Sequence, residues 1–131
     1  MTDIKSMNME ELKELMTQIG EKPFRAKQIY GWLHEHLVTS YDEMANIPKS
    51  LKEKLKDYPI TALEELDVQT SKVDGTRKYL FRLSDGNMIE SVLMRYKYGN
   101  SVCISSQAGC RMGCRFCAST IGGLTRNLLP S

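Results

Sequence analysis

All four cysteines of the chain lie in the stretch CISSQAGCRMGCRFC, which runs from Cys103 to Cys117. Cys110, Cys114 and Cys117 have the spacing C-x3-C-x2-C, and Cys103 stands seven positions before this trio. Thiolates bind iron and zinc, and a thiolate is also a nucleophile and a redox group. In a chain that begins without a secretion signal, such a bunched set indicates a metal or redox site rather than a disulfide framework.

The trio suits one kind of metal centre better than another. A cube-shaped 4Fe-4S cluster held by three thiolates keeps one iron without a protein ligand, where a small chelating molecule can bind. A structural zinc site needs four ligands, and Cys103 is the one candidate for the fourth. Zinc knuckles usually pair one C-x2-C with a second, which this chain lacks. We therefore expect a cluster, with a vestigial or zinc-binding cysteine loop as the alternative.

A carboxylate interrupts an apolar row in the stretch NMIESVLM. Because side chains alternate along a strand, one face there would carry Met88, Glu90, Val92 and Met94. Apolar neighbours disfavour the charged form of a carboxyl group, and such a group can accept a proton near neutral pH. The alternative is a glutamate on an edge strand that points into water. The spacing alone leaves both interpretations of Glu90 open.

Charge is distributed unevenly along the chain. Residues 91–131 contain no acid and five basic residues, Arg95, Lys97, Arg111, Arg115 and Arg126. A cysteine cluster in a basic segment suits an anionic ligand such as phosphate, a carboxylate or an RNA backbone. A segment this short can also lack acids by chance, so the charge pattern alone leaves the ligand open.

Helical patterns fill residues 1 to about 58. Apolar residues recur at helical spacing from Met9 to Ile19 and again from Ala26 to Leu37. Gly20 indicates a helix stop. Helix starts are indicated by Asn8 with Glu11, by Pro23, by Ser40 and by Pro48. The lysines after Pro48 form either a solvated face or a contact with RNA.

Short alternating runs replace the helical pattern from about residue 60. The pairs Asp74-Gly75 and Asp85-Gly86 are turn signals between these runs. The predicted antiparallel strands cover about 64–71, 76–83 and 88–95. A further strand, SVCIS, leads into the cysteine loop. Helices followed by an antiparallel meander predict an α+β fold.

Composition narrows the class of protein. The 131 residues are 41% hydrophobic and 26% charged, which is ordinary for a globular protein. No apolar run is long enough to span a bilayer, and the opening stretch MTDIKSMNMEELKEL has no apolar signal core. We therefore expect a cytoplasmic protein without membrane contacts.

The stretch CRMGCRFC resembles the cluster-binding signature of radical S-adenosylmethionine (SAM) enzymes, including the aromatic Phe116 before the last cysteine. More narrowly, the chain resembles the N-terminal part of the RlmN/Cfr family of adenine methyltransferases. Five stretches carry this resemblance in the family's order, KPFRAKQIYGWLH, SYDEMANIPKSLKEKL, DGTRKYLFRLSDGNMIESVLM, CISSQAGCRMGCRFCAS and GGLTRNL. The cluster signature is generic, whereas this order with Cys103 ahead of the trio is specific to the family.

The resemblance implies cofactors and their ligands. Cys110, Cys114 and Cys117 match the residues that hold a 4Fe-4S cluster, whose open iron binds the amino and carboxylate groups of SAM. Phe116 belongs to the same cofactor-binding signature. Reductive cleavage of SAM would give a 5′-deoxyadenosyl radical, chemistry that belongs to the cofactor while the protein positions it.

The resemblance also implies a reaction and its partners. Glu90 matches the family's proton acceptor, and Cys103 matches the cysteine that resolves a covalent RNA–enzyme adduct through a transient disulfide. The implied reaction is methylation of carbon 2 of an adenine in 23S rRNA and in tRNA, through a methylcysteine intermediate. A Cfr-like reaction at carbon 8 is the alternative. A flavodoxin or ferredoxin would supply electrons, and the enzyme would be a monomer.

The implied organisation has three parts. Residues 1–58 would be a helical accessory domain that binds RNA, 59–95 an antiparallel strand extension, and 96–131 the truncated start of a partial (β/α)6 radical-SAM barrel. The family's methyl-carrying cysteine and further SAM-binding segments lie downstream. We therefore expect these 131 residues alone to be inactive. A stand-alone RNA-binding module remains the alternative from another functional class.

Overall fold

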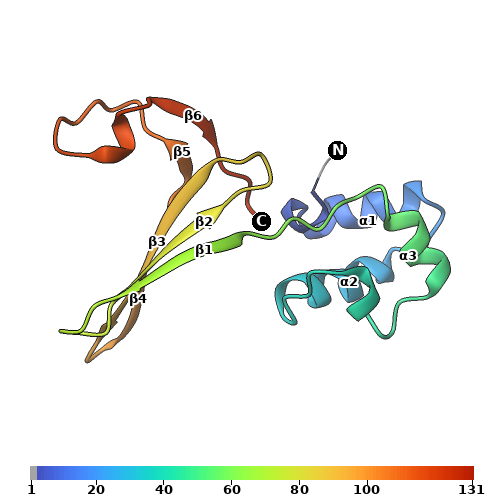
Figure 1. The fold of residues 1–131 in the computed structure, drawn as a ribbon. Helices are drawn as coiled ribbons and strands as arrows, with labels where there is room; N and C mark the ends of the chain where they lie inside the picture. The colour runs from blue at the N-terminus through green and yellow to red at the C-terminus, as the bar shows by residue number, and fades with distance from the viewer. Residues whose placement is uncertain (1–2) are drawn as a thin grey trace. The chain divides into compact units, whose positions relative to one another are not determined.

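The structure, a computed structural model, describes residues 3–131 and divides into two compact units (Figure 1). The helical unit runs to Thr61 and includes Leu129–Ser131, and the strand unit is Ala62–Leu128. Helices and antiparallel sheets thus occupy separate parts of the chain, as the predicted α+β class requires. Within residues 3–131, no helix has the length and apolar character needed to cross a membrane.

The helical unit contains three α-helices and two short 3-10 helices. In chain order they are η1 (Ile4–Ser6), α1 (Met9–Gln18), α2 (Phe24–His34), η2 (Tyr41–Glu43) and α3 (Lys49–Leu55). Each predicted helix start is confirmed within one or two residues. The predicted apolar stripe ran on to Leu37, but α2 ends at His34. Leu37 has a positive φ of 53° and is exposed, and Val38 is buried instead.

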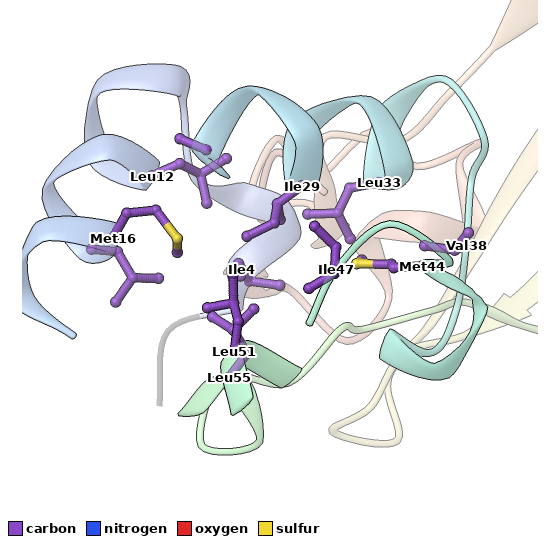
Figure 2. Close-up of a cluster of buried hydrophobic side chains, with 12 residues drawn as sticks. Ile4, Leu12, Met16, Ile29, Leu33, Val38, Met44, Ile47, Leu51 and Leu55 are labelled. Carbon is purple, nitrogen blue, oxygen red and sulfur yellow. The ribbon is translucent and has the colours of Figure 1, made fainter. Parts of the chain in front are cut away.

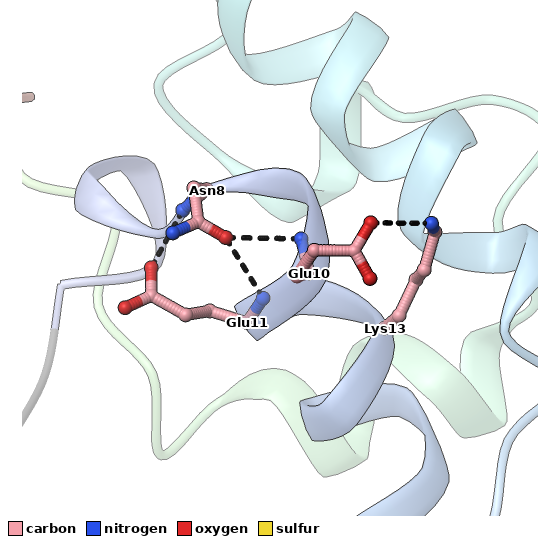
Figure 3. A network of polar contacts seen from close by, with 4 residues as sticks. All are labelled: Asn8, Glu10, Glu11 and Lys13. Carbon is pink, nitrogen blue, oxygen red and sulfur yellow. Dashed lines mark hydrogen bonds and ion pairs between the residues drawn. The ribbon is translucent and has the colours of Figure 1, made fainter.

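The start of α1 is a capping box (Figure 3). The Asn8 side chain accepts hydrogen bonds from the backbone N–H groups of Glu10 and Glu11, at 2.9 and 3.0 Å. The Glu11 carboxylate accepts one from the Asn8 backbone at 2.7 Å. Three backbone donors near the helix end are therefore satisfied by the sequence itself. Lys13 pairs with Glu10 one turn later, at 2.7 Å.

The end of α1 is also determined by contacts between residues that are close in the sequence. Gly20 has a φ of 73°, a left-handed conformation that glycine adopts without strain. The N–H of Glu21 donates to the carbonyl of Met16 at 2.7 Å, and the N–H of Gly20 donates to Thr17 at 3.1 Å. These two bonds form a Schellman motif, which satisfies carbonyls that the helix leaves open. The stop predicted at Gly20 is confirmed.

A single apolar core holds the helical unit together (Figure 2). Each α-helix contributes one buried stripe, and η1 and the segment between α2 and α3 contribute the remainder. The buried residues are Ile4, Leu12, Leu15, Met16, Ala26, Ile29, Leu33, Val38, Met44, Ile47, Leu51 and Leu55. Because burial of each large aliphatic side chain contributes about 1.5–3 kcal/mol, this core gives the unit its stability.

The strand unit is built on a four-stranded antiparallel sheet with the order β1-β2-β3-β4. Its strands are β1 (Glu64–Thr70), β2 (Arg77–Arg82), β3 (Met88–Tyr96) and β4 (Gly99–Cys103). The three-stranded meander predicted from the turn signals is confirmed, with strand ends within one residue of those expected. The further strand predicted at SVCIS begins and ends two residues earlier, as β4. One irregularity lies in β1, where the register with β2 shifts between Glu65 and Asp67.

A second, two-stranded sheet encloses the cysteine loop. It pairs β5 (Gln107–Gly109) with β6 (Leu124–Asn127), and the 3-10 helix η3 (Ala118–Thr120) lies in the loop between them. Neither of these two strands was predicted from the sequence. The β-forming stretch LTRN returns beside Gln107–Gly109 and pairs with it antiparallel. The start of a barrel is not confirmed.

Candidate functional site

The pairing of β3 with β4 brings two predicted catalytic residues to one face of the sheet. Val92 lies directly opposite Cys103 in this register. Residues opposite each other in an antiparallel pair share a face, and so do residues two apart in one strand. Glu90 therefore lies on the same face as Cys103, as its diagonal neighbour across the two strands. The strand of Glu90 and the strand that ends at Cys103 are therefore direct neighbours in the sheet.

Glu90 is exposed and paired. It lies on β3, an interior strand, and its side chain is 57% exposed. The Lys78 ammonium of β2 lies 3.1 Å from Glu90 Oε1. Apolar neighbours therefore do not bury this carboxylate. It points into water, as in the alternative interpretation, but from an interior strand rather than an edge strand. The carboxylate is accessible to a substrate and held by a cation.

Cys103 ends β4 as an exposed, free thiol. Just beyond it, the Ser105 hydroxyl donates a hydrogen bond of 3.0 Å to the backbone carbonyl of Glu90. This bond continues the contact between the two strands past the end of the ladder. The segment that leads into the cysteine loop is thus hydrogen-bonded to the backbone of Glu90.

The base of the cysteine loop is closed by a close approach of two backbones. The N–H of Cys110 donates to the carbonyl of Gly123 at 3.0 Å. Gly109 has a φ of 76°, and a Cβ at this position would lie 2.1 Å from the Gly123 carbonyl oxygen. No other residue type fits there without displacing backbone. The glycine before the first ligand position is thus required by the way the hairpin closes.

Hydrogen bonds also order the interior of the loop. The N–H of Cys117 donates to the carbonyl of Cys114 at 3.1 Å. The Thr120 hydroxyl lies 3.1 Å from the Cys114 carbonyl and 2.9 Å from that of Cys117. Two of the three predicted ligands are therefore on one tight turn, with their backbone positions fixed by Thr120.

The three thiols fit a cluster by their donor chemistry. Cys110, Cys114 and Cys117 are free and half-buried, on one loop closed at its base. Their sulfur atoms do not converge, since no group of three His, Cys, Asp or Glu side chains within residues 3–131 is placed to hold a metal ion. Phe116 is 94% exposed at the tip of the loop. The three donors therefore lie on one loop, but their sulfur atoms are not arranged around a common point.

Two ionic contacts of the site were not predicted. Lys78 pairs with Glu90, and the Arg126 guanidinium of β6 donates a hydrogen bond to the Asp85 carboxylate in the turn between β2 and β3. That guanidinium holds the pKa of Asp85 down, to about 2. The alternation of β2 and β3 could have indicated Lys78, because it lies on the face of Glu90. Nothing local indicates the partner of Arg126, which is 41 residues from Asp85.

Comparison with protein families assigns the first part of the chain. Residues 2–60 match the family described as the ribosomal RNA large subunit methyltransferase N-terminal domain. This match covers the helical unit and stops at the point where the strand unit begins.

Comparison with curated proteins extends the similarity to the whole chain. A probable dual-specificity RNA methyltransferase RlmN of Lachnoclostridium phytofermentans is 62% identical over 98% of this chain. One from Lachnospira eligens is 61% identical over 100% of it, and one from Bacillus subtilis is 55% identical over 95%. The chain spans about a third of the length of these relatives, between 34% and 38%.

Among solved structures, a radical SAM methyltransferase from Sphaerobacter thermophilus is similar. It is 39% identical in sequence with a TM-score of 0.86, over 98% of this chain and 38% of that protein. The helices, the sheet and the cysteine hairpin thus have counterparts in the solved structure of a radical SAM methyltransferase.

Proposed function

The chain belongs to the RlmN family, and on that premise we propose that it forms the cluster-binding and proton-accepting part of a radical SAM RNA methyltransferase. The proposed reaction is methylation of carbon 2 of an adenine in 23S rRNA and in tRNA. The observation that carries the proposal is the register of β3 with β4. It places Glu90 and Cys103 on one face of the sheet, and Cys103 lies seven residues before the first of three free thiols on one loop.

Three residues would hold the cofactor. Cys110, Cys114 and Cys117 would bind a 4Fe-4S cluster with an open iron for SAM, and Phe116 would lie beside them. When bound, this centre supplies the electron transfer and the methyl groups that the reaction needs. The protein's own part is to keep the thiols half-buried on a loop whose base Gly109 allows to close. A flavodoxin or ferredoxin would bring the electrons.

Glu90 and Cys103 would act on the RNA. The Glu90 carboxylate would accept the proton that the adenine carbon loses as the methyl group is added. The alternation of side chains along β3 places the carboxylate on this face, where the Lys78 ammonium pairs with it. The Cys103 thiolate would attack the sulfur of a second cysteine, outside this chain, that is bonded through a carbon to the RNA. The disulfide would form as the sulfur–carbon bond breaks, and that carbon would take the electron pair and a proton to become the methyl group of the freed RNA.

Iron analysis tests the division of roles among the cysteines. After anaerobic reconstitution the chain should bind about four irons with inorganic sulfide. Cys114→Ala should lose them, because two thiolates hold the cube poorly. Cys103→Ala is the matched control and should retain them, since it removes a thiol outside the trio. A chain that binds one zinc and no iron would support the alternative of a zinc loop on an RNA-binding module. Loss of iron in Cys103→Ala would make Cys103 a ligand.

A further inference from the structure

Two hairpin turns meet at one end of the four-stranded sheet, away from the cysteine loop in the strand unit. The β1–β2 turn follows the pair Thr70↔Arg77, and the β3–β4 turn follows Tyr96↔Gly99. Since Arg77 also pairs with Leu93, both turns project from the same end, and Figure 1 shows them there. We call this surface the hairpin end. Its residues are Lys72, Arg77, Arg95, Tyr96, Lys97 and Tyr98.

Two tyrosines stack in the open at the hairpin end. The rings of Tyr96 and Tyr98 have centroids 5.0 Å apart and an interplanar angle of 9°. Their residues are 48% and 82% exposed. Aromatic rings usually bury their faces in a core or an interface, and a stacked pair left in solvent is therefore available to a further flat ring.

The cations at the hairpin end have no carboxylate partners. Lys72, Arg77, Arg95 and Lys97 are exposed, and none takes part in the ion pairs found within residues 3–131. The neighbouring cations of β2 differ, since Lys78 pairs with Glu90 and Arg82 pairs with Glu64. Lys78 and Arg82 of β2 are thus neutralised by carboxylates, whereas the cations of the hairpin end are not.

Asp74 is the one acid in the two turns, and its carboxylate is engaged locally. It accepts a hydrogen bond of 3.0 Å from the backbone N–H of Thr76. This bond lowers the pKa of Asp74 below its ordinary value. The carboxylate therefore caps the β1–β2 turn, and the hairpin end keeps an excess of positive charge.

We propose that the hairpin end binds a single-stranded segment of RNA. An unstacked base would lie on the free face of the Tyr98 ring, and a neighbouring phosphate would contact Lys97 in the same turn. Arg77 and Arg95 share the sheet face opposite to Tyr96, since Arg77 lies opposite Leu93, and would contact phosphates where the RNA passes around the hairpin end. Stacking on aromatic rings together with a basic surface is the usual recognition of unpaired nucleotides. The proposal rests on the proposed function, in which the substrate is RNA. It adds a contact made by the strand unit, at the end of the sheet where the two turns lie.

Direct binding tests the stacking. Fluorescence anisotropy of the 131-residue chain would use two labelled RNAs, a stem with an unpaired loop and a blunt duplex of equal length. Tyr98→Leu should weaken binding of the loop RNA about tenfold, within the range found for one stacked base. Binding of the duplex should stay unchanged. Tyr98→Phe is the matched control and should bind both RNAs as the unchanged chain does, because it keeps the ring.

The salt dependence tests the charges. Arg95→Ala should weaken binding of both RNAs and reduce the slope of log affinity against log salt by about 0.7–0.9. Arg82→Ala is the control, because it removes an exposed arginine of the same sheet that is already paired with Glu64. Equal effects of the two substitutions would show net charge rather than a site, and would overturn the proposal. So would unchanged loop binding in Tyr98→Leu, or competition by poly-glutamate as effective as that by RNA.

These measurements need neither iron nor SAM. Selective loss of loop RNA in Tyr98→Leu would stand even if a protein of the relatives' length methylated nothing. Conversely, a protein of the relatives' length could methylate RNA while Tyr98→Leu and Arg95→Ala leave its RNA affinity unchanged. That result would overturn only the proposal for the hairpin end. A result that overturns one of the two proposals therefore does not overturn the other.

Discussion

At the scale of single residues, the structure bears most directly on the proposed chemistry at Glu90. Its carboxylate is open to solvent, lies on the face of Cys103 and is held by Lys78 at 3.1 Å. A surface ion pair contributes little to stability, typically about 0–1 kcal/mol. The pair therefore matters for where it holds the carboxylate rather than for the stability of the fold.

Glu90→Gln should separate proton transfer from the earlier steps. The amide keeps the size and most hydrogen bonding of the carboxylate but cannot accept the proton. In a protein of the relatives' full length, methylated adenine should fall about 100-fold or more, the scale of losing a general base. Deoxyadenosine formation and iron content should persist.

Glu65→Gln is the matched control for this substitution. Glu65 is exposed on β1 opposite Phe81, on the other face of the sheet, and its loss should change neither product. Yields of methylated adenine like those of the unchanged protein in Glu90→Gln would show that Glu90 is only a strand residue.

At the scale of elements, the cysteine hairpin depends on one backbone contact. Gly109→Ala should prevent β5 and β6 from closing, because the new Cβ would meet the Gly123 carbonyl oxygen at 2.1 Å. Amide exchange at Cys110, whose N–H donates to that carbonyl, should accelerate by about tenfold or more, since the hydrogen bond no longer protects it. Iron retained after reconstitution should fall in parallel.

Gly113→Ala provides the control within the same loop. Gly113 also has a positive φ, of 69°, but a Cβ there meets nothing within 4 Å. This substitution adds only the strain of a left-handed alanine, about 1–2 kcal/mol. Exchange at Cys110 should stay close to that of the unchanged chain. Equal effects of both substitutions would mean that conformational strain, not the close approach at Gly109, limits the hairpin.

A second element-scale prediction concerns acid. The Arg126 guanidinium lowers the pKa of Asp85 from 3.8 to about 2. Because the folded pKa lies below the unfolded one, the pair's contribution is present above about pH 4 and is lost as the pH falls toward 2. Amide protection in β6 should therefore be constant from pH 7 to pH 4 and decline below that.

Asp85→Asn should remove this decline and lower the protection of β6 at pH 7. Asp74→Asn is the control, because the Asp74 carboxylate caps the β1–β2 turn and does not contact β6. A decline between pH 4 and pH 2 that persists in Asp85→Asn would assign the acid sensitivity to another carboxylate.

Local signals explain which elements the sequence could predict. The capping box at Asn8, the stop at Gly20 and the two Asp-Gly turns each act through bonds within a few residues of chain. The pairing of β5 with β6 joins residues 20 apart, such as Gln107 and Asn127, and no local pattern selects it. The same holds for Arg126 with Asp85.

The site was predictable to a similar extent. Alternation placed Glu90 on a strand face, and the spacing of the cysteines placed three thiols on one loop. The exposure of Glu90 was not predictable, because it depends on what covers that face of the sheet. The positions of the sulfur atoms, which do not converge among residues 3–131, were not predictable either, since the spacing shows only that the three thiols share one loop.

At the scale of the whole molecule, the two units differ in what they bury. The helical unit has a core to which every helix contributes, whereas the strand unit buries two apolar side chains, Ile89 and Ala108, among its described residues. A sheet with so little buried apolar surface is stabilised mainly by its backbone ladder and its cross-strand pairs. The residues with proposed chemical roles all lie in this thinly packed unit.

The bulge in β1 also governs how copies of the chain can meet in solution. β1 is an edge strand, and an unpaired strand edge is a template for ordered aggregation with a second copy. The register shift between Glu65 and Asp67 breaks the regular row of outward N–H and C=O groups. Glu65 and Asp67, which form no ion pair within residues 3–131, would also repel their counterparts in a copy aligned along the same edge. An acidic, irregular edge of this kind keeps an exposed sheet from polymerising.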